Sequence, residues 1–273
     1  MQEKSMNAPA ISVIMSVKNG EATIKRSIDS ILNQTLQDFE FIICDDGSTD
    51  DTLSIILSYQ KRDNRIVAMQ NKQSYGLAYS LNACIKEARS NILARQDADD
   101  WSDEHRFEMQ YKFVKEHPEY AIVGTQWYNV SENGNLKKSD VMVCPSARDQ
   151  ISRGQFLHPT WMMRKDMLEK VGFYTVNKYT QRSQDYHLAL KVLGAGMKMY
   201  NLSEPLYYYS ADDATIARSI NWKRVKGLMW IRYDGYRRNN MPIWAYIYVF
   251  KPVVANLTPR SIMVKHYKSV YSK

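Results

Sequence analysis

The sequence predicts an α/β fold in which helices cover both faces of a largely parallel sheet. Short apolar segments alternate with segments of helical periodicity along residues 11–130, which is the pattern of successive β-α-β units. Polar clusters directly follow three of the apolar segments, with the sequences KNGE, DDGSTD and DADD. Since ligands bind at the carboxyl ends of parallel strands, these clusters should meet in one site at one edge of the sheet.

The elements of the first half follow from the spacing of their apolar residues. Compact apolar runs predict strands, and recurrence every three or four positions predicts helices, as for Ile24, Ile28 and Ile31. Ser, Thr and Asp residues can cap the second helix. The strands are expected at 11–17, 39–44, 65–70, 91–96 and 120–130, and the helices within 19–35, 45–62, 75–88 and 103–116.

The alternation changes near residue 145. A polar turn is predicted at 132–140, and a boundary is placed between it and residue 150. The later elements are a short helix at 165–171, a helix at 183–193 and an aromatic strand at 204–210. The chain is therefore divided into three parts, 1–145, 146–219 and 220–273.

The composition is that of an ordinary globular protein, with 44% hydrophobic and 24% charged residues. Its three cysteines, Cys44, Cys84 and Cys144, are far apart and odd in number, which argues against a disulfide framework and favours a reducing compartment. The N-terminal residues lack the features of a signal peptide, and no stretch reaches the roughly 18–20 apolar residues that span a bilayer. We therefore expect a cytoplasmic protein.

The positive charge is concentrated in residues 220–273. This segment has eleven Lys or Arg residues and one acidic residue, Asp234, so it carries +10 and leaves −2 on residues 1–219. Its apolar part is interrupted by Pro242 and Pro252. Two interpretations stay open: peripheral contact with an anionic membrane surface, or a helix packed on the rest of the protein with its charges in water. No nucleic-acid-binding motif accompanies the charge, so nucleic acid is not an expected partner.

The segment ARQDADDW at 94–101 places Asp97, Asp99 and Asp100 directly after an apolar strand. Carboxylates of this kind hold Mg²⁺ or Mn²⁺, which can neutralise phosphate groups. The alternative, an acidic cap of the next helix, suits Asp103 or Glu104 better. Arg106 and Gln110 lie four positions apart on that helix, where they either support the acidic loop or face solvent.

Six segments between residues 10 and 210 carry ordered motifs: SVIMSVKNGEATIKRSIDSILNQT, FIICDDGSTDDT, YGLAYSLNACI, ARQDADDWSDEHRFEMQYKFVKEHPEYAIVG, HPTWMMRKDMLEKVGFY and SQDYHLALKVLGAG. In this order along the chain, they resemble the motifs of family 2 glycosyltransferases of the GT-A type. The resemblance implies a Rossmann-like nucleotide-binding mixed sheet with helices on both faces, followed by a basic and aromatic helical tail. It also implies that 1–145 binds a nucleotide sugar, and that 146–219 binds the acceptor and carries a catalytic base.

The resemblance assigns roles to four residues of the nucleotide-binding half. Asp99 is the expected metal ligand, and Asp97 is expected to contact the ribose hydroxyls. Asp45 would accept a hydrogen bond from the imide N–H of uracil, and Ser16 would contact the same nucleotide. The alternative for Asp45 is an ordinary turn residue in DDGSTD, where Asp, Gly and Ser are common.

In the second half, the resemblance makes Asp185 the general base, although an acid in the first turn of a helix also stabilises the helix dipole. His158 is a candidate for the acceptor pocket, with a buried, hydrogen-bonded histidine as the alternative. The sequence departs from the family pattern at Gln184, His187 and Ala189, where acidic or aromatic residues are usual. These departures predict an unusual acceptor preference.

The implied function is that of an inverting, metal-dependent hexosyltransferase that uses a nucleotide sugar, with UDP as the expected nucleotide. The expected acceptor is a glycan or a lipid-linked glycan of cell-surface polysaccharide synthesis, handled at the cytoplasmic face of the membrane. Two alternatives stay open. One is a sugar-nucleotide pyrophosphorylase, for which MSVKNGEATIKR is a poor phosphate loop. The other is a catalytically degenerate nucleotide-binding module, which the departures at Gln184 and His187 would allow.

Overall fold

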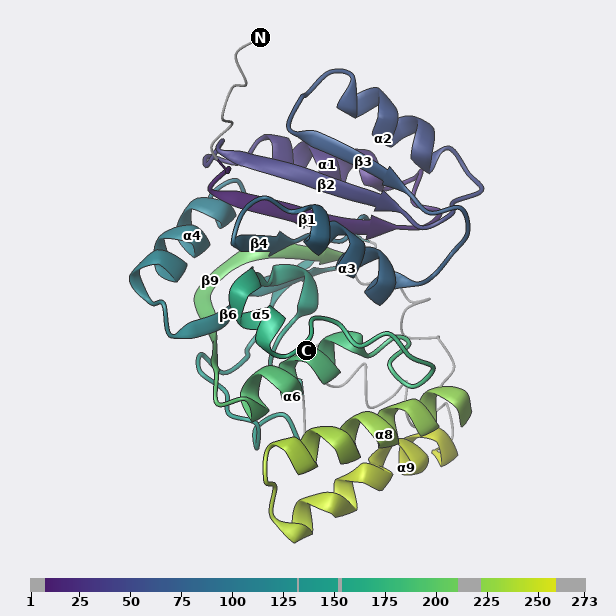
Figure 1. Ribbon diagram of the computed structural model, residues 1–273, viewed down its shortest axis with the longest axis vertical. Coiled ribbons are helices and arrows are strands. Elements are labelled where there is room, and N and C mark those ends of the chain that lie inside the picture. The colour runs from purple at the N-terminus through teal and green to yellow at the C-terminus, as the bar shows by residue number, and fades with distance from the viewer. Residues whose placement is uncertain (1–7, 132, 152–153, 211–221, 259–273) are drawn as a thin grey trace.

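The computed structural model describes residues 8–131, 133–151, 154–210 and 222–258 of the protein (Figure 1). The N-terminal residues 1–7, and residues 220–221 and 259–273 of the predicted basic tail, lie outside these ranges. Within the described ranges, no helix has the length and apolar character needed to cross a membrane.

Every strand and helix predicted before residue 131 is present, with boundaries shifted by a few residues at most. One further element, the two-residue strand β5, follows the acidic loop directly. The observed elements are β1 (Ile11–Val17), α1 (Ile24–Leu32), β2 (Phe39–Asp45), α2 (Thr52–Gln60), β3 (Ile66–Gln70), α3 (Leu77–Glu87), β4 (Ile92–Arg95), β5 (Trp101–Ser102), α4 (Arg106–Glu116) and β6 (Tyr120–Val130).

The second half differs from the prediction at two strands. A short strand, β7, pairs with β6 within the segment predicted to be a polar turn, so a hairpin replaces that turn. The aromatic strand β9 begins six residues before the predicted start, because its pairing with β6 shifts register around Pro205 and so hides the alternation of side chains. The elements are β7 (Leu136–Lys138), η1 (His158–Thr160), β8 (Met162–Arg164), α5 (Lys165–Lys170), α6 (Gln184–Gly194), β9 (Lys198–Ser210), α8 (Trp222–Arg238), η2 (Ile243–Phe250) and α9 (Lys251–Leu257).

The strands form one mixed sheet in the order β3-β2-β1-β4-β8-β6-β9-β5, with β7 beside β6. The first four strands are parallel, as the β-α-β pattern predicts. Strand β8 runs antiparallel to both β4 and β6, which joins the two halves of the chain in a single sheet. The prediction of an α/β fold with a mixed sheet is therefore confirmed.

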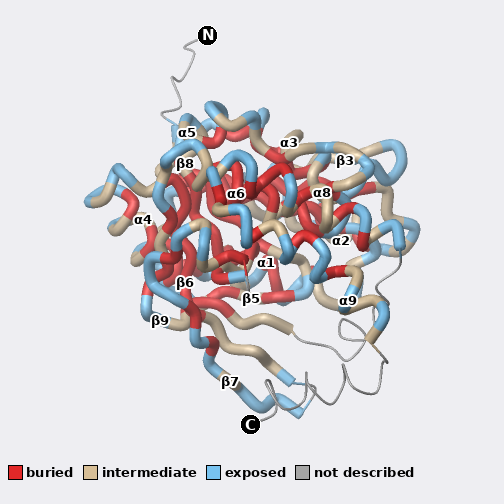
Figure 2. The backbone as a smooth tube through the Cα atoms, turned by 90° about the horizontal axis from the view of Figure 1, so that it is seen from below, coloured by how far each residue is buried: buried red, intermediate tan, exposed pale blue. Residues whose placement is uncertain are grey.

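Alternating side chains of the sheet build two separate cores. In β1, Val13 and Met15 pack with α1, α2 and α4, whereas Ile14 packs with α3, α5 and α6 on the other face. Figure 2 shows these buried strands in the interior of the molecule. Burying both faces explains why the strands are nearly continuous apolar runs. Because helices cover both faces of the sheet, the loops that follow the parallel strands all lie at one edge of it.

Helix α8 packs on α6, away from the parallel strands, at the lower end of the molecule in Figure 1. Two glycines allow the close approach: a Cβ at Gly227 would lie 2.5 Å from the carbonyl oxygen of Tyr179, and one at Gly235 would lie 2.3 Å from Leu190. Asp234 Oδ2 accepts hydrogen bonds from His187 Nε2 at 3.0 Å and from Arg238 Nε at 2.5 Å. For α8, the structure thus shows the packed helix that was one of the two interpretations of the tail.

The contact between Asp234 and His187 makes the attachment of α8 sensitive to acid. Burial acts to raise the pKa of Asp234, but the hydrogen bonds from Arg238 and His187 outweigh it, and the pKa is lowered. Burial lowers the pKa of His187 more than Asp234 raises it. Both groups therefore bind protons more weakly in the folded than in the unfolded chain. Their stabilisation is present at neutral pH and is lost as the pH falls below about 6.5 for His187 and about 4 for Asp234.

We predict that Asp234→Asn lowers the free energy of unfolding at pH 7 by about 1–3 kcal/mol, because it weakens a largely buried charge-assisted network. The difference from the unsubstituted protein should shrink below about pH 4, where Asp234 itself becomes protonated. Urea unfolding at pH 7 and pH 3.5 measures both effects, with the exposed Asp140→Asn as the control. An equal loss of stability at the two pH values would contradict this account.

Candidate functional site

The three polar clusters meet at the carboxyl ends of β1, β2 and β4, as the sequence predicts. Asn19, just after β1, accepts a hydrogen bond from the Thr49 backbone N–H at 2.9 Å and donates its own backbone N–H to Ser48 Oγ at 2.9 Å. Ser27 on α1 donates its hydroxyl to the carbonyl of Asp97 at 2.7 Å. The loop after β1 is thus joined directly to the loop after β2, and helix α1 is joined to the loop after β4.

Asp45 ends β2 and is completely buried. Its Oδ2 accepts a hydrogen bond from the backbone N–H of Ser48 at 3.2 Å. Its Oδ1 is also buried, yet no described residue donates a hydrogen bond to it. A buried carboxylate oxygen without a donor is costly, so it indicates a place where a ligand supplies an N–H or O–H group.

The neighbouring Asp46 has a different role, which the sequence analysis missed. Its two oxygens accept five hydrogen bonds, three from the side chains of Asn71, Ser74 and Ser80 and two from the backbone N–H groups of Tyr75 and Gly76. Burial acts to raise the pKa of Asp46, but these bonds outweigh it and lower the pKa. Asp46 therefore fixes the loop before α3 and has no oxygen to spare for a ligand.

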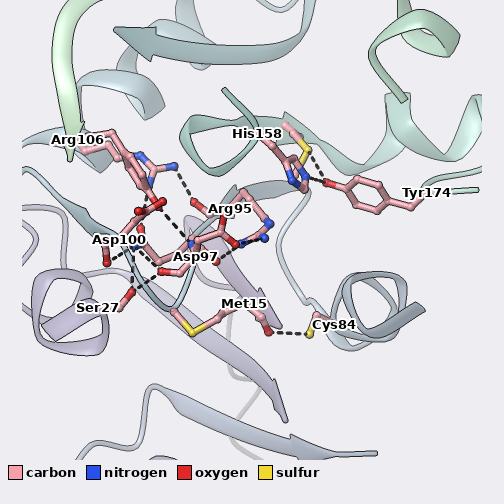
Figure 3. Close-up of polar contacts among 12 residues, drawn as sticks. Met15, Ser27, Cys84, Arg95, Asp97, Asp100, Arg106, His158 and Tyr174 are labelled. Atoms are coloured by element: carbon pink, nitrogen blue, oxygen red, sulfur yellow. Dashed lines mark hydrogen bonds and ion pairs between the residues drawn. The ribbon is translucent and has the colours of Figure 1, made fainter. Parts of the chain in front are cut away.

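Two buried side chains, Gln96 and Arg106, hold the acidic loop from the inside (Figure 3). Gln96 Nε2 donates to Ser27 Oγ at 3.0 Å and to the carbonyls of Asp97 and Asp100 at 3.1 and 3.2 Å. The Arg106 guanidinium donates to the carbonyl of Arg95 at 2.8 Å, to Gln96 Oε1 at 3.1 Å and to Ser102 Oγ at 2.9 Å.

Arg106 also donates to Gln110 Oε1 at 3.0 Å. Of the two interpretations of Arg106 and Gln110, the structure shows the supporting one, because both side chains are fully buried. Burial lowers the pKa of Arg106 to about 10, so it remains a cation at neutral pH. A fixed positive charge therefore lies directly beneath the acidic loop, where it offsets part of the repulsion among the carboxylates.

The three carboxylates of the loop have different surroundings. Asp100 is 1% exposed, and its oxygens accept the Tyr207 hydroxyl at 3.1 Å and the Ser210 backbone N–H at 2.8 Å. Burial and the neighbouring charges of Asp99 and Asp97 raise the pKa of Asp100 well above its usual value. Asp97 is half-buried and paired with the buried Arg95, whereas Asp99 is exposed. Asp100 thus anchors the loop to β9, and the other two face outward.

The acidic loop fits a divalent cation. One oxygen from each of Asp97, Asp99 and Asp100 lies within 4.8 Å of the others. Carboxylate oxygens are the donors that Mg²⁺ and Mn²⁺ prefer. Both Asp100 oxygens accept hydrogen bonds within the protein, so Asp100 is the least suited of the three to hold an ion, and Asp99 is the most exposed.

Asp185 lies in the first turn of α6 and is half-buried. Burial raises its pKa, and the negative charge of Asp97 adds to the increase, while backbone N–H groups and the charge of Arg95 act against it. Asp185 is therefore within electrostatic range of the acidic loop, although almost ninety residues separate the two in the sequence. A carboxylate with a raised pKa accepts a proton more readily than an ordinary aspartate.

His158 is buried, and its Nε2 forms a 2.7 Å hydrogen bond with the Tyr174 hydroxyl. Burial and the nearby charge of Arg95 lower its pKa well below the usual value, so the ring is neutral. Figure 3 shows the pair beside Arg95, on the side away from Asp100. This is the buried, hydrogen-bonded alternative of the sequence analysis, and contact with an acceptor remains a prediction.

Ser16 also lies at the carboxyl-end edge, 9% exposed, opposite Cys44 in the register of β1 and β2. Asp45 is opposite Val17. Because alternate residues of a strand point to opposite faces, the Ser16 and Asp45 side chains leave the sheet on different sides. The structure thus brings Asp45, Asp97, Asp99 and Asp185 towards one edge and leaves a shared contact of Ser16 with the same ligand as a prediction.

The departures from the family pattern have a structural explanation at one position. His187 is 1% exposed and points to Asp234 on α8, so it holds the tail and does not face the site. The sequence analysis missed this role, and it also missed Gln96, Arg95 and Tyr207. A charged or amide residue at the end of a buried strand was the signal available for Arg95 and Gln96. Tyr207 had no such signal, since its partner Asp100 is distant in the sequence.

Residues 12–178 match the family model described as glycosyl transferase family 2. Over 264 residues the chain is 35% identical to EpsE of Bacillus subtilis (strain 168), which carries a glycosyltransferase name, and the match covers 96% of this chain and 94% of that protein. Over 216 residues it is 33% identical to the O-antigen biosynthesis glycosyltransferase WbnJ of Escherichia coli, covering 77% of this chain and 82% of WbnJ.

Two solved structures have the same fold. TarS residues 1–349 of S. aureus, in complex with UDP-GlcNAc, superimposes with a TM-score of 0.69 at 19% identity, over 96% of this chain and 76% of that one. The mannosyltransferase PcManGT of Pyrobaculum calidifontis, in complex with GDP-Man and Mn²⁺, gives 0.65 at 17% identity, over 98% and 82%. These similarities confirm the predicted GT-A type of fold.

Proposed function

Since the chain belongs to glycosyltransferase family 2, we propose that it is an inverting, metal-dependent enzyme that transfers a sugar from UDP to a glycan or lipid-linked acceptor. The O-antigen enzyme among its relatives supports a role in bacterial surface-polysaccharide synthesis. The cytoplasm, where the cysteines can stay reduced, is the proposed compartment.

The observation that favours uracil over cytosine is the buried Oδ1 of Asp45, to which no described residue donates a hydrogen bond. Uracil has an imide N–H that can donate to a carboxylate, whereas cytosine presents an acceptor nitrogen at that position. A buried carboxylate that rejects a second acceptor discriminates strongly, because the wrong base would leave two acceptors facing each other. Of the two solved structures that share the fold, TarS is in complex with UDP-GlcNAc and PcManGT with GDP-Man, so the fold itself accommodates more than one base.

The proposed metal ligand is Asp99, with Asp97 beside it. When bound, the cation neutralises the negative charge that builds up on the departing diphosphate. Arg95 holds the side chain of Asp97, and Gln96 holds the backbone carbonyls of Asp97 and Asp100. The loop therefore presents its carboxylates in a fixed arrangement before the donor arrives, which lowers the cost of ordering the site.

Asp185 is the proposed general base. The acceptor hydroxyl attacks the anomeric carbon of the donor sugar as the bond from that carbon to the phosphate oxygen breaks. Asp185 takes the hydroxyl proton, and the nucleoside diphosphate leaves with the bonding electron pair. Attack on the side opposite the leaving group inverts the anomeric configuration. The raised pKa of Asp185 supports this role, because it increases the proton affinity of the carboxylate.

We predict that Asp45→Asn reduces the affinity for UDP by about tenfold and increases the affinity for CDP, because the amide N–H₂ of asparagine can donate to cytosine. Isothermal titration of both nucleotides with Mn²⁺ measures the ratio. The control is Asp51→Asn, an exposed acid of the same loop. An unchanged UDP-to-CDP ratio would remove Asp45 from base recognition.

We predict that Asp185→Asn abolishes sugar transfer, by about a thousandfold or more, and leaves UDP affinity nearly unchanged. Asp166→Asn is the matched control, since Asp166 is the first-turn acid of α5 and is exposed. If the role of Asp185 were only to stabilise its helix, the two variants would lose similar stability and both would retain transfer.

A further inference from the structure

The segment 243–257, formed by η2 and α9, presents an apolar face to solvent. Six of its side chains are more than half exposed along one side of the helical segment: Ile243 (86%), Trp244 (57%), Ile247 (72%), Phe250 (57%), Val254 (64%) and Leu257 (68%). We call these six residues the apolar face. Their spacing of three or four positions, with Ile243 and Trp244 adjacent, keeps them on one side of the helix.

The other side of the same segment is also apolar, but it is buried. Ala245 and Val249 pack with Ile151, Tyr236 and Met241 in a third core that joins the segment to α8. The segment contains one charged residue, Lys251. A helix that is apolar on every side is normally buried completely, so the apolar face is a surface that another apolar phase or molecule covers.

The charge around this face identifies what covers it. Arg237 and Arg238 are exposed at the end of α8, and Lys251 is exposed within the segment itself. Over residues 222–258, the described part of the tail, there are seven Lys or Arg residues and one acidic residue, Asp234, with which Arg237 and Arg238 are paired. A second copy of the chain would bring the same positive charge to the contact, whereas anionic headgroups would neutralise it. Trp244 and Tyr248 are side chains of the type enriched where a bilayer meets water.

We propose that the apolar face lies in the headgroup region of an anionic phospholipid bilayer, with the helical segment parallel to the membrane plane. The inference does not depend on the proposed function, because binding is measured without any donor or acceptor. One interpretation of the sequence is that 220–273 as a whole contacts an anionic membrane surface. In this proposal only residues 243–257 contact the membrane, and α8 connects them to the catalytic half. Since α8 is packed on α6, the helix that carries Asp185 is held at a fixed position relative to the membrane (Figure 1).

The test is co-sedimentation of the full chain with vesicles of phosphatidylcholine alone and with about one third phosphatidylglycerol. The anionic vesicles should bind most of the protein, the neutral ones several-fold less, and salt at about 0.5 M should weaken the binding. Ile247→Glu should reduce binding by about tenfold, because it places a charge in the middle of the apolar face. Ile243→Glu, at the most exposed position, should do the same.

The matched control is Leu136→Glu, which changes an equally apolar side chain, 53% exposed, on β7. It should bind vesicles as the unsubstituted protein does, and all three variants should unfold at nearly the same temperature. Equal binding by Ile247→Glu and Leu136→Glu would overturn the proposal. A dimer that Ile247→Glu dissociates, in a protein that does not sediment with anionic vesicles, would also overturn it and assign the face to a second copy.

Discussion

The arrangement of the site depends on a buried guanidinium beneath a loop of carboxylates. Arg106 is fully buried and donates to the carbonyl of Arg95 and to the side chains of Gln96, Ser102 and Gln110. These bonds fix both ends of the loop that carries Asp97, Asp99 and Asp100, and Gln96 fixes its middle. A buried cation costs free energy unless it is well hydrogen-bonded, and here the same bonds that satisfy Arg106 also set the position of the acidic residues.

The three carboxylates can then serve different purposes despite their proximity. Asp100 is held by Tyr207 and Ser210 and ties the loop to β9, so the donor-binding edge is linked to the strand that enters the second half. Asp97 is balanced by Arg95, and Asp99 remains exposed. In the proposed function, the repulsion that remains among these carboxylates favours the uptake of a cation together with a diphosphate. On the other side of the sheet, α6 places Asp185 within range of Asp97 and at the same time holds α8 through His187. One helix thereby connects the proposed base to the tail.

The order of strands and helices in the first half was predictable, because β1, β2 and β4 are buried on both faces and must be nearly continuous apolar runs. The site edge was predictable for the same reason, since polar clusters follow strands whose ends must meet. The motif resemblance predicted roles for Asp45, Asp99 and Asp185, and these roles stay predictions. It could not distinguish Asp45 from Asp46, because their difference lies in five donors to Asp46, four from the loop before α3 and one, Ser80, from α3 itself. The sequence also could not reveal the contact of Tyr207 with Asp100 or that of His187 with Asp234. The two residues of each pair are far apart in the sequence, and only folding brings them together. The start of β9 was missed because a register shift at Pro205 conceals the strand pattern.

If the acidic loop is a metal-dependent site for a nucleoside diphosphate, as proposed, the protein should bind UDP more tightly in the presence of Mn²⁺. Calorimetric titration of UDP, with and without Mn²⁺, should show that the ion raises the affinity of the unsubstituted protein by about tenfold or more, since it adds ligands to the phosphate oxygens. In Asp99→Asn this enhancement should disappear, while the affinity without metal stays the same. An equal enhancement in Asp99→Asn, or UDP binding to the unsubstituted protein that ignores Mn²⁺, would contradict the account.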